Sequence, residues 1–199
     1  MFTHVRDRRA KDFARAAESD FVARLARARI GGTFNQYASS PLRRERLRLY
    51  LEARAGAEVV LVGEAAGYRG ARVSGIAFTS ERQLTGAGPA EASATIVHRV
   101  LERLGVEEDV LLWNVVPTHP GTAHSNRPPR RDEIEAAGPF LADVLRGRAV
   151  IAVGRVAAAA TGAPYVRHPS HGGAAAFEAG FERAFATIRR RRAGVRRFL

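Results

Sequence analysis

The sequence predicts an α/β fold, a three-layer α/β/α sandwich in which helices cover both faces of a four-stranded parallel sheet. Three observations lead to this prediction. Four short runs of β-branched and aliphatic residues have the length of buried strands. Segments with apolar residues at helical spacing separate these runs. The chain has 199 residues, of which 46% are hydrophobic, so it can form one globular domain with its own core.

Two helices are predicted before the first strand. Residues 1–30 have apolar side chains at roughly helical spacing, and Gly31 ends the pattern. A second helix is predicted over residues 41–55, because Pro41 suits a first helical turn and Gly56 stops the pattern.

The remaining elements alternate between strand and helix. In order they are strand 58–62, helix 90–104, strand 110–115, helix 132–146, strand 149–154, a short alanine-rich helix after Gly154, strand 165–167, and a closing helix marked by Phe177, Phe181, Phe185 and Ile188. In parallel sheets of this kind, ligands bind beyond the carboxyl ends of the strands. The residues that follow each strand are therefore the candidates for function.

We expect these elements to form a single domain. It consists of an N-terminal helical region over residues 1–56, an α/β core over residues 57–188 and a basic tail over residues 189–199. Arginine-rich helix ends are usually solvated. We therefore assign the tail only a non-specific, salt-sensitive affinity for polyanions.

Charge and cysteine content narrow the classes of function. The chain has 32 Lys+Arg against 20 Asp+Glu, a formal net charge of +12, and every basic residue except Lys11 is arginine. Such a surface attracts nucleic acid, although an arginine-rich composition is equally typical of a GC-rich genome. The absence of cysteine excludes disulfides, thiol catalysis and iron–sulfur clusters. We expect a cytoplasmic protein, because no apolar stretch approaches the roughly 20 residues of a membrane span and no signal-peptide core opens the chain.

A carboxylate, an amide and an imidazole follow three of the predicted strands. Glu64 lies in the glycine-containing turn after the first strand, Asn114 ends the second, and His168 follows the fourth. Each has an ordinary structural explanation, namely a solvated or capping charge, a strand amide bonded to backbone, and a His-Pro turn. Because parallel strands end at one edge of a sheet, we expect the three side chains to meet, which indicates a functional site.

Two short motifs, which follow the first and last predicted strands, resemble signatures of the uracil-DNA glycosylase superfamily. Gly63-Glu64-Ala65-Ala66-Gly67 is similar to Gly-Gln-Asp-Pro-Tyr of one branch and to Gly-Glu-Ala-Pro-Gly of the iron–sulfur branch. His168-Pro169-Ser170 matches the His-Pro-Ser signature. The resemblance covers residues 58–181 and implies a four-stranded parallel sheet.

Two further motifs lie between these signatures in the family order. Gly75-Ile76-Ala77-Phe78-Thr79 resembles the segment whose phenylalanine stacks on the flipped base, which implies that role for Phe78. Leu111-Leu112-Trp113-Asn114 resembles the strand whose asparagine reads the edge of uracil. Each motif alone is a weak signal, but the four together in this order are a strong one.

The resemblance implies that the chain excises uracil from DNA and leaves an abasic site. His168 is expected to donate a hydrogen bond to the uracil O2 as it becomes anionic, with help from the backbone N–H groups of Gly63, Glu64 and Ala65. Glu64, the only carboxylate expected at the pocket mouth, would orient or deprotonate the attacking water. Asn114 matches N3–H and O4 of uracil and mismatches cytosine. The implied chemistry needs no metal and no organic cofactor.

The chain departs from the family pattern in the first signature. Ala65 stands where the Gly-Gln-Asp-Pro-Tyr branch has its water-activating aspartate, and Ala66 replaces the proline. Gly67 replaces the tyrosine that excludes the methyl group of thymine, and the adjacent Tyr68 is a candidate for that role. Without cysteine, the resemblance is to a cluster-free branch. Schiff-base chemistry is not expected, because the only lysine, Lys11, is far upstream in sequence.

The expected partner is uracil-containing DNA, bound by a monomer. Arg127 is a candidate phosphate contact, although a loop that caps the helix near Asp132 explains it equally well. His171 is the candidate for the side chain that fills the vacated position in the duplex. Small hydrogen-bond donors in tight loops also bind phosphates. The remaining predicted DNA contacts are Ser80, Ser170, Gly172 and Gly173.

Three other functions stay open. The same fold can excise another base, such as hypoxanthine or thymine, because Gly67 leaves room near C5. A non-catalytic module that recognises lesions is suggested by the alanine at position 65. An α/β domain that binds a free nucleotide would explain the sheet and the glycine loop, but not the pairing of His168 with Asn114.

Overall fold

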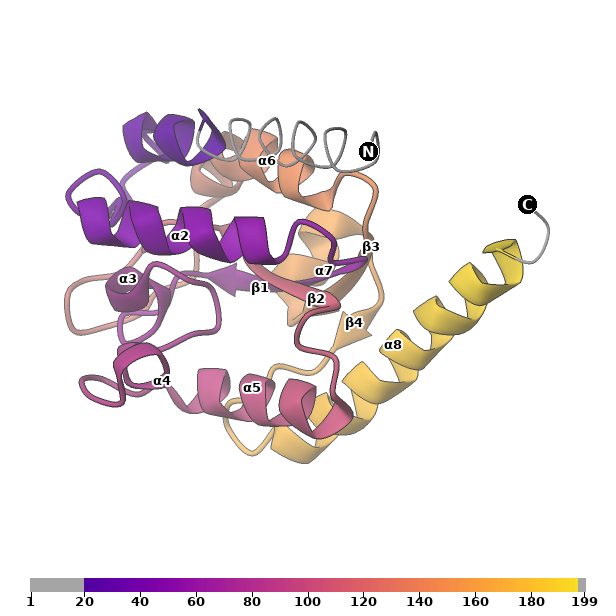
Figure 1. Cartoon of the computed structure of the whole chain (residues 1–199). Helices are drawn as coiled ribbons and strands as arrows, with labels where there is room; N and C mark the ends of the chain where they lie inside the picture. Colours follow the sequence, from indigo (N-terminus) through magenta and orange to yellow (C-terminus); the bar gives the residue numbers. More distant parts are fainter. Residues whose placement is uncertain (1–19, 197–199) are drawn as a thin grey trace, which may run out of the picture.

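A four-stranded parallel sheet forms the centre of the protein, with strand order β2-β1-β3-β4 (Figure 1). The central strand β1 (Val59–Ala65) pairs with β2 (Val110–Val116) and β3 (Ala149–Val153), and β3 pairs with β4 (Tyr165–Val166). The computed structural model describes residues 20–196 of the chain. The predicted fold class is confirmed, since all three pairings are parallel and helices lie on both faces of the sheet.

The helices agree closely with the predicted order. Their bounds are α2 (Pro41–Ala53), α3 (Ala71–Ser74), α4 (Glu81–Thr85), α5 (Ala92–Leu104), α6 (Arg131–Leu145), α7 (Arg155–Thr161) and α8 (Ala174–Arg196), preceded by a helical segment over residues 20–27. Residues 1–19 of the first predicted helix lie outside the described residues, and the described part ends at residue 27, before Gly31. At α2 the Ser40 side chain accepts a hydrogen bond from the Arg43 N–H, and Pro41 occupies the first turn as expected.

Alternate residues of each strand belong to two separate hydrophobic cores, one on each face of the sheet. Val60 and Trp113 belong to the core beneath α2 and α6, where Phe21 packs 5.7 Å from the Trp113 ring. Leu61 and Leu112 belong to the core beneath α5 and α8. Because successive strand residues face opposite sides, burial of both faces explains the unbroken apolar runs in the sequence.

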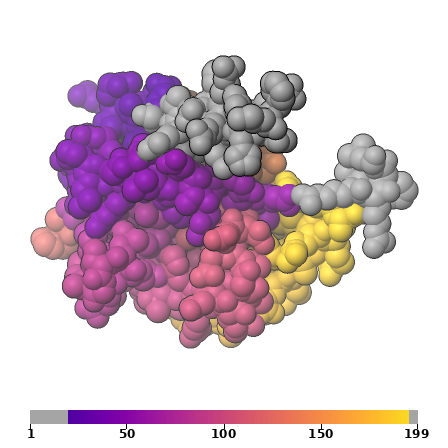
Figure 2. All heavy atoms as spheres, viewed as in Figure 1, coloured from indigo at the N-terminus to yellow at the C-terminus, as the bar shows by residue number. Residues whose placement is uncertain are grey.

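The structure corrects two boundaries that matter for the site. β1 continues past residue 62 to Ala65, so Gly63 and Glu64 lie in the end of a strand rather than in a turn. α8 is 23 residues long and includes most of the predicted basic tail. In Figure 1 it extends well beyond the sheet, and in Figure 2 its yellow residues lie at the margin of this face.

The short helices α3 and α4 were not predicted, because four or five residues are too few to show a helical period. Within residues 20–196, no helix has both the length and the apolar content required to span a lipid bilayer.

Candidate active site

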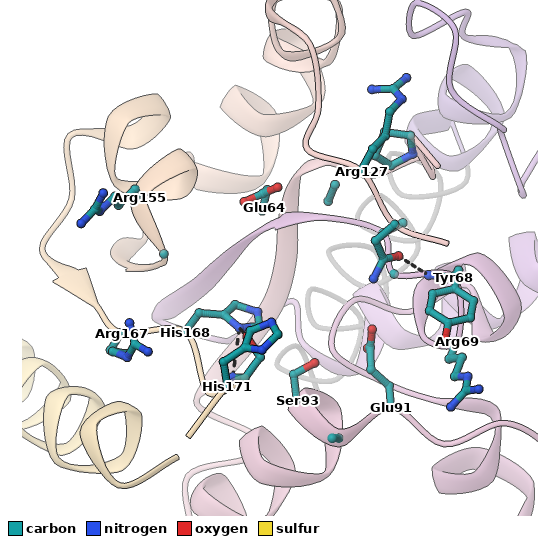
Figure 3. Close-up of a pocket in the computed structure, with 18 of the residues that line it drawn as sticks. Glu64, Tyr68, Arg69, Glu91, Ser93, Arg127, Arg155, Arg167, His168 and His171 are labelled. Carbon is teal, nitrogen blue, oxygen red and sulfur yellow. Dashed lines mark hydrogen bonds between the residues drawn. The ribbon is translucent and has the colours of Figure 1, made fainter. Parts of the chain in front are cut away.

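A cleft of about 650 Å³ lies at the carboxyl ends of the strands, as the topology predicts (Figure 3). A smaller pocket of about 50 Å³ adjoins it, and we call this the base pocket. The cleft and the base pocket share six lining residues, which are Glu64, Ala65, Gly67, Glu91, Ser93 and His168. The base pocket also has Phe78 and Asn114 in its wall.

The pocket lies where the sheet opens. The β1–β2 register continues to Ala65↔Val116, but the β1–β3 register ends at Val62↔Ala152. The end of β1 therefore keeps one neighbour and loses the other within the described part of the chain. Glu64 and Ala65 line the cleft at this point, so the topology itself positions them there.

The structure brings together the three side chains expected to meet. Glu64, Asn114 and His168 all line the base pocket, although they come from β1, β2 and the loop after β4. Asn114 is only 5% exposed. The predicted stacking residue, Phe78, lines the same pocket.

Phe78 is held in an uncommon backbone conformation. Its φ of 51° lies in the left-handed region, which an aromatic residue rarely adopts. The neighbouring Thr79 fixes it, because the Thr79 hydroxyl donates to the Ala77 carbonyl at 3.1 Å and lies 3.0 Å from Nε2 of His98. The Ser74 hydroxyl donates to the Thr79 carbonyl at 2.6 Å. The ring is thus positioned before any ligand binds.

His168 presents a neutral ring with a defined tautomer. The Ser170 N–H donates to Nδ1 of His168 at 3.2 Å, and the Ser170 hydroxyl lies 2.8 Å from the same atom. Because Nδ1 accepts, the neutral ring carries its proton on Nε2. Burial lowers the pKa of His168, and the nearby His171 and Arg167 lower it further. The site therefore offers an Nε2–H donor without a positive charge.

Glu64 is a half-buried carboxylate at the mouth of the base pocket. Burial raises the pKa of its carboxyl group. Among the residues that the structure describes, none forms an ion pair or a side-chain hydrogen bond with it. Both features suit a group that binds water and accepts a proton.

A second carboxylate, Glu91, corrects the expectation that Glu64 is alone at the pocket. Glu91 precedes α5 and lines both the cleft and the base pocket. Burial raises the pKa of its carboxyl group as well. Sequence reasoning missed this residue, whose only signal was its place at the start of a predicted helix, because only the folded chain brings it to β1.

Four arginines line the cleft. Figure 3 shows Arg155 and Arg167 on one side of it and Arg69 and Arg127 on the other. Arg155 and Arg167 are exposed, and within residues 20–196 neither forms an ion pair or a side-chain hydrogen bond. The Arg69 guanidinium lies 5.3 Å from the Tyr68 ring. This arrangement provides positive charge for a polyanion along the cleft.

Tyr68, a predicted pocket residue, lines the cleft and not the base pocket. Its backbone N–H donates to Oδ1 of Asn126 at 2.9 Å, which joins the loop after β1 to the loop before α6. The Tyr68 ring therefore lies outside the base pocket and does not replace the tyrosine that the Gly-Gln-Asp-Pro-Tyr branch has at the position of Gly67.

Arg127 also lines the cleft, but its guanidinium already has a partner. Its Nη1 and Nη2 atoms donate to the two carboxylate oxygens of Glu133 at 2.8 and 2.5 Å. Glu133 is fully buried and also accepts from the Arg130 N–H, which caps α6. The capping role weighed for this loop is present, and the phosphate contact of Arg127 stays a prediction.

Two of the predicted DNA contacts do not fit the structure. Ser80 is 0% exposed, and its hydroxyl donates to Oε1 of Gln83 at the start of α4, so it has no access to a phosphate. The Gly173 N–H donates to the Ser170 carbonyl at 3.0 Å and is not free for a ligand. Both errors have the same cause, since local caps and turns use donors that a motif alone leaves unassigned.

The other predicted contacts lie near the cleft. Ser170 and His171 line it, and His171 is exposed with a φ of 51°. Gly172 follows with a φ of 73°, so the loop before α8 turns sharply at these two residues. Within residues 20–196, no three His, Asp or Glu side chains gather closely enough to hold a metal ion.

The chain is similar to a known protein family and to a solved structure. A family model described as the Uracil DNA glycosylase superfamily matches residues 52–189. Among solved structures, the chain is similar to the wild-type SMUG2 of Pedobacter heparinus, with a TM-score of 0.64 and 13% identity over 87% of this chain and 98% of that chain. At this identity the likeness shows a shared fold. The comparison with curated proteins gives no match.

Proposed function

The chain belongs to the uracil DNA glycosylase superfamily and is a DNA glycosylase, and we propose that the base it excises is uracil. One observation carries the proposal. An amide, a neutral imidazole, an aromatic ring and two carboxylates surround a single pocket at the sheet edge. The proposed enzyme flips uracil from the duplex, hydrolyses its N-glycosidic bond and leaves an abasic site in an uncut strand.

Asn114 supports the choice of base. Its amide offers one acceptor and one donor, which match N3–H and O4 of uracil. Cytosine presents an unprotonated N3 and an amino group, so both hydrogen bonds fail unless the amide rotates by 180°. Since Asn114 is almost fully buried, the mismatched groups would have no water to compensate them.

His168 and Glu64 each stabilise one of the two charges that develop during the reaction. The C1′–N1 bond breaks with its electrons going to the base, so negative charge grows on O2 and positive charge on the sugar. The Nε2–H of His168 stabilises the first by donating to O2. Glu64 stabilises the second and accepts a proton from the water whose oxygen bonds to C1′. The chain has no cysteine and its only lysine is Lys11, so water is the proposed nucleophile.

The test is single-turnover excision from an end-labelled duplex that contains one uracil opposite guanine, with alkali to reveal abasic sites. We expect His168→Ala to slow excision by about 10²–10³-fold and Glu64→Gln by about 10²–10⁴-fold. Glu107→Gln is the matched control, because Glu107 is exposed before β2 at the opposite end of the sheet. A wild-type protein that binds the duplex but produces no abasic site would contradict the proposal and favour a lesion-binding module.

A further inference from the structure

The Glu91 carboxylate occupies space that the first signature leaves empty. A Cβ placed on Gly67 would collide with Oε1 of Glu91, and a Cβ placed on Gly70 would collide with Oε2. The carboxylate therefore lies directly against the backbone of the loop after β1. The φ of neither glycine lies in the left-handed region, so a side chain at either position would conflict with the Glu91 carboxylate and not with the backbone conformation.

Local structure does not explain why a glutamate is found here. Glu91 is the N-cap residue of α5, but its side chain forms no capping hydrogen bond. Within residues 20–196, no side chain or backbone group forms a hydrogen bond or ion pair with the carboxylate. A mostly buried, unpartnered carboxylate destabilises a fold, so its presence beside a pocket suggests a role in ligand selection.

The other pocket residues determine which edge of the base would face Glu91. On the proposed function, His168 binds O2, Asn114 binds N3–H and O4, and Phe78 covers a face of the ring. The edge that remains is C5–C6. Besides Glu64 and Ala65, the wall that remains is formed by Gly67, Glu91 and Ser93, and Figure 3 shows Glu91 across the cleft from His168.

We propose that Glu91 is a specificity-determining residue, whose carboxylate closes the base pocket at the C5 edge and excludes bases with a substituent there, thymine first among them. The inference rests on the proposed function and extends it to the choice between uracil and thymine. A hydrogen at C5 fits against the carboxylate. A methyl group would have to displace the side chain and cover its oxygens with an apolar surface. Gly67 thus leaves no opening, because a residue 24 positions later in the chain fills the space.

The first experiment compares single-turnover excision of uracil and of thymine, each opposite guanine, by the wild type and by Glu91→Ala. We expect the ratio of the thymine rate to the uracil rate to rise about 10- to 200-fold in the variant, the range for one methyl group in a shaped pocket. Glu91→Gln keeps the size of the side chain, so its ratio should stay within about threefold of the wild type. Glu107→Ala is the matched control for loss of an exposed glutamate.

A second measurement uses only the wild-type protein, so it does not depend on the folding of a variant. The wild type is given duplexes with 5-fluoro-, 5-chloro- and 5-bromouracil, whose electron-withdrawing substituents make them better leaving groups than uracil. We expect the excision rate to fall as the substituent grows, against this electronic trend. Rates that stay flat or rise with substituent size would overturn the proposal.

The outcomes separate this inference from the proposed function. If the wild type does not excise uracil, the proposed function fails. If the wild type and Glu91→Ala both excise uracil with the same thymine-to-uracil ratio, Glu91 does not select the base. If Glu91→Ala loses uracil excision while its thermal unfolding midpoint is unchanged, Glu91 acts in the chemistry and the specificity role is wrong. A thymine-to-uracil ratio that rises as much in Glu91→Gln as in Glu91→Ala would contradict the proposal that the size of this side chain closes the pocket.

Discussion

Gly63 and Asn114 face each other in the register of β1 and β2, and a Cβ on Gly63 would lie 2.6 Å from Oδ1 of Asn114. The same Cβ would lie 2.5 Å from Cζ of Phe78. The first glycine of the signature therefore allows the Asn114 amide and the Phe78 ring to approach each other. Its φ lies outside the left-handed region, so the requirement concerns space and not backbone conformation.

Gly63→Ala is expected to damage both activity and stability. The added methyl group must push the Asn114 amide or the Phe78 ring aside, and a displacement of about 1 Å can reduce a rate by about 10²-fold. Overpacking of this kind costs about 1–3 kcal/mol of unfolding free energy. Excision kinetics and urea unfolding measure the two effects. Gly56→Ala is the control, because a Cβ there meets nothing within 4 Å.

The pH dependence of excision should follow Glu64. Its raised pKa keeps the carboxyl group protonated to a higher pH than an ordinary glutamate, whose reference value is 4.5. Since the proposed chemistry needs the carboxylate, the rate should rise with pH through a midpoint above 4.5 and then level off. Single-turnover rates across the acid range test this prediction. The midpoint should persist in His168→Ala and vanish in Glu64→Gln, and a midpoint that survives in Glu64→Gln would assign it to another group.

Thr79 is expected to position the stacking ring. Thr79→Val keeps the shape of the side chain but removes its hydrogen bond to the Ala77 carbonyl and its contact with His98. The buried groups left without a partner should reduce stability by about 1–3 kcal/mol, and a freer Phe78 should raise KM more than it lowers kcat. Thr79→Ser retains the hydroxyl and should restore the wild-type KM. Equal kinetics in all three proteins would show that the ring needs no such support.

The two unpaired arginines of the cleft should contribute to duplex binding through charge alone. Arg155→Ala and Arg167→Ala are each expected to weaken binding to all sequences alike and to reduce the slope of log K against log[salt] by about 0.9. Fluorescence anisotropy with a labelled duplex at several salt concentrations gives this slope. Arg131→Ala is the control, because this arginine is fully exposed on α6 and paired with Glu135. Unchanged slopes for the two cleft variants would place the DNA elsewhere.

Glu133 should stabilise the fold only where it is ionised. The Arg127 guanidinium lowers the pKa of Glu133 below its reference value of 4.5, with help from the Arg130 N–H. A group whose pKa is lower in the folded state contributes stability above its unfolded pKa, and this contribution is lost as the pH falls through the folded value. Glu133→Ala should therefore lower the free energy of unfolding by about 3–5 kcal/mol at pH 7, and the difference from wild type should become smaller at pH values below 4.5. Urea unfolding at neutral and acid pH measures the change, and a difference that does not depend on pH would mean that packing dominates.

The sequence was sufficient for the sheet and for the side chains that end its strands. Alternating apolar runs and helical periods determine which segments are strands, and parallel topology then places Glu64, Asn114 and His168 at one edge. Phe78 was predicted as the stacking residue from its motif alone, and it lines the base pocket. Nothing in the periodicity predicted that its backbone would adopt a positive φ.

The rest of the site depends on side-chain contacts that hydrophobic periodicity does not encode. Glu91 reaches the pocket because the start of α5 packs beside the loop after β1. The Ser80 side chain is buried because it caps α4, a helix too short to predict. Arg127 finds Glu133 only once α6 has formed. Glu91 is thus placed by a loop distant in the chain, whereas Ser80 and Arg127 are bound by side chains three and six residues away.

The early end of the β1–β3 register has a consequence for how such a site can evolve. Past Val62 the backbone of β1 presents an open edge, and an open edge is ordinarily a hazard because it invites pairing with another chain. Here Glu64 and Ala65, which follow the last residue paired with β3, line a cleft instead. Lengthening β3 by a few residues would close the gap with ordinary sheet hydrogen bonds and would be expected to give a more stable but inert protein.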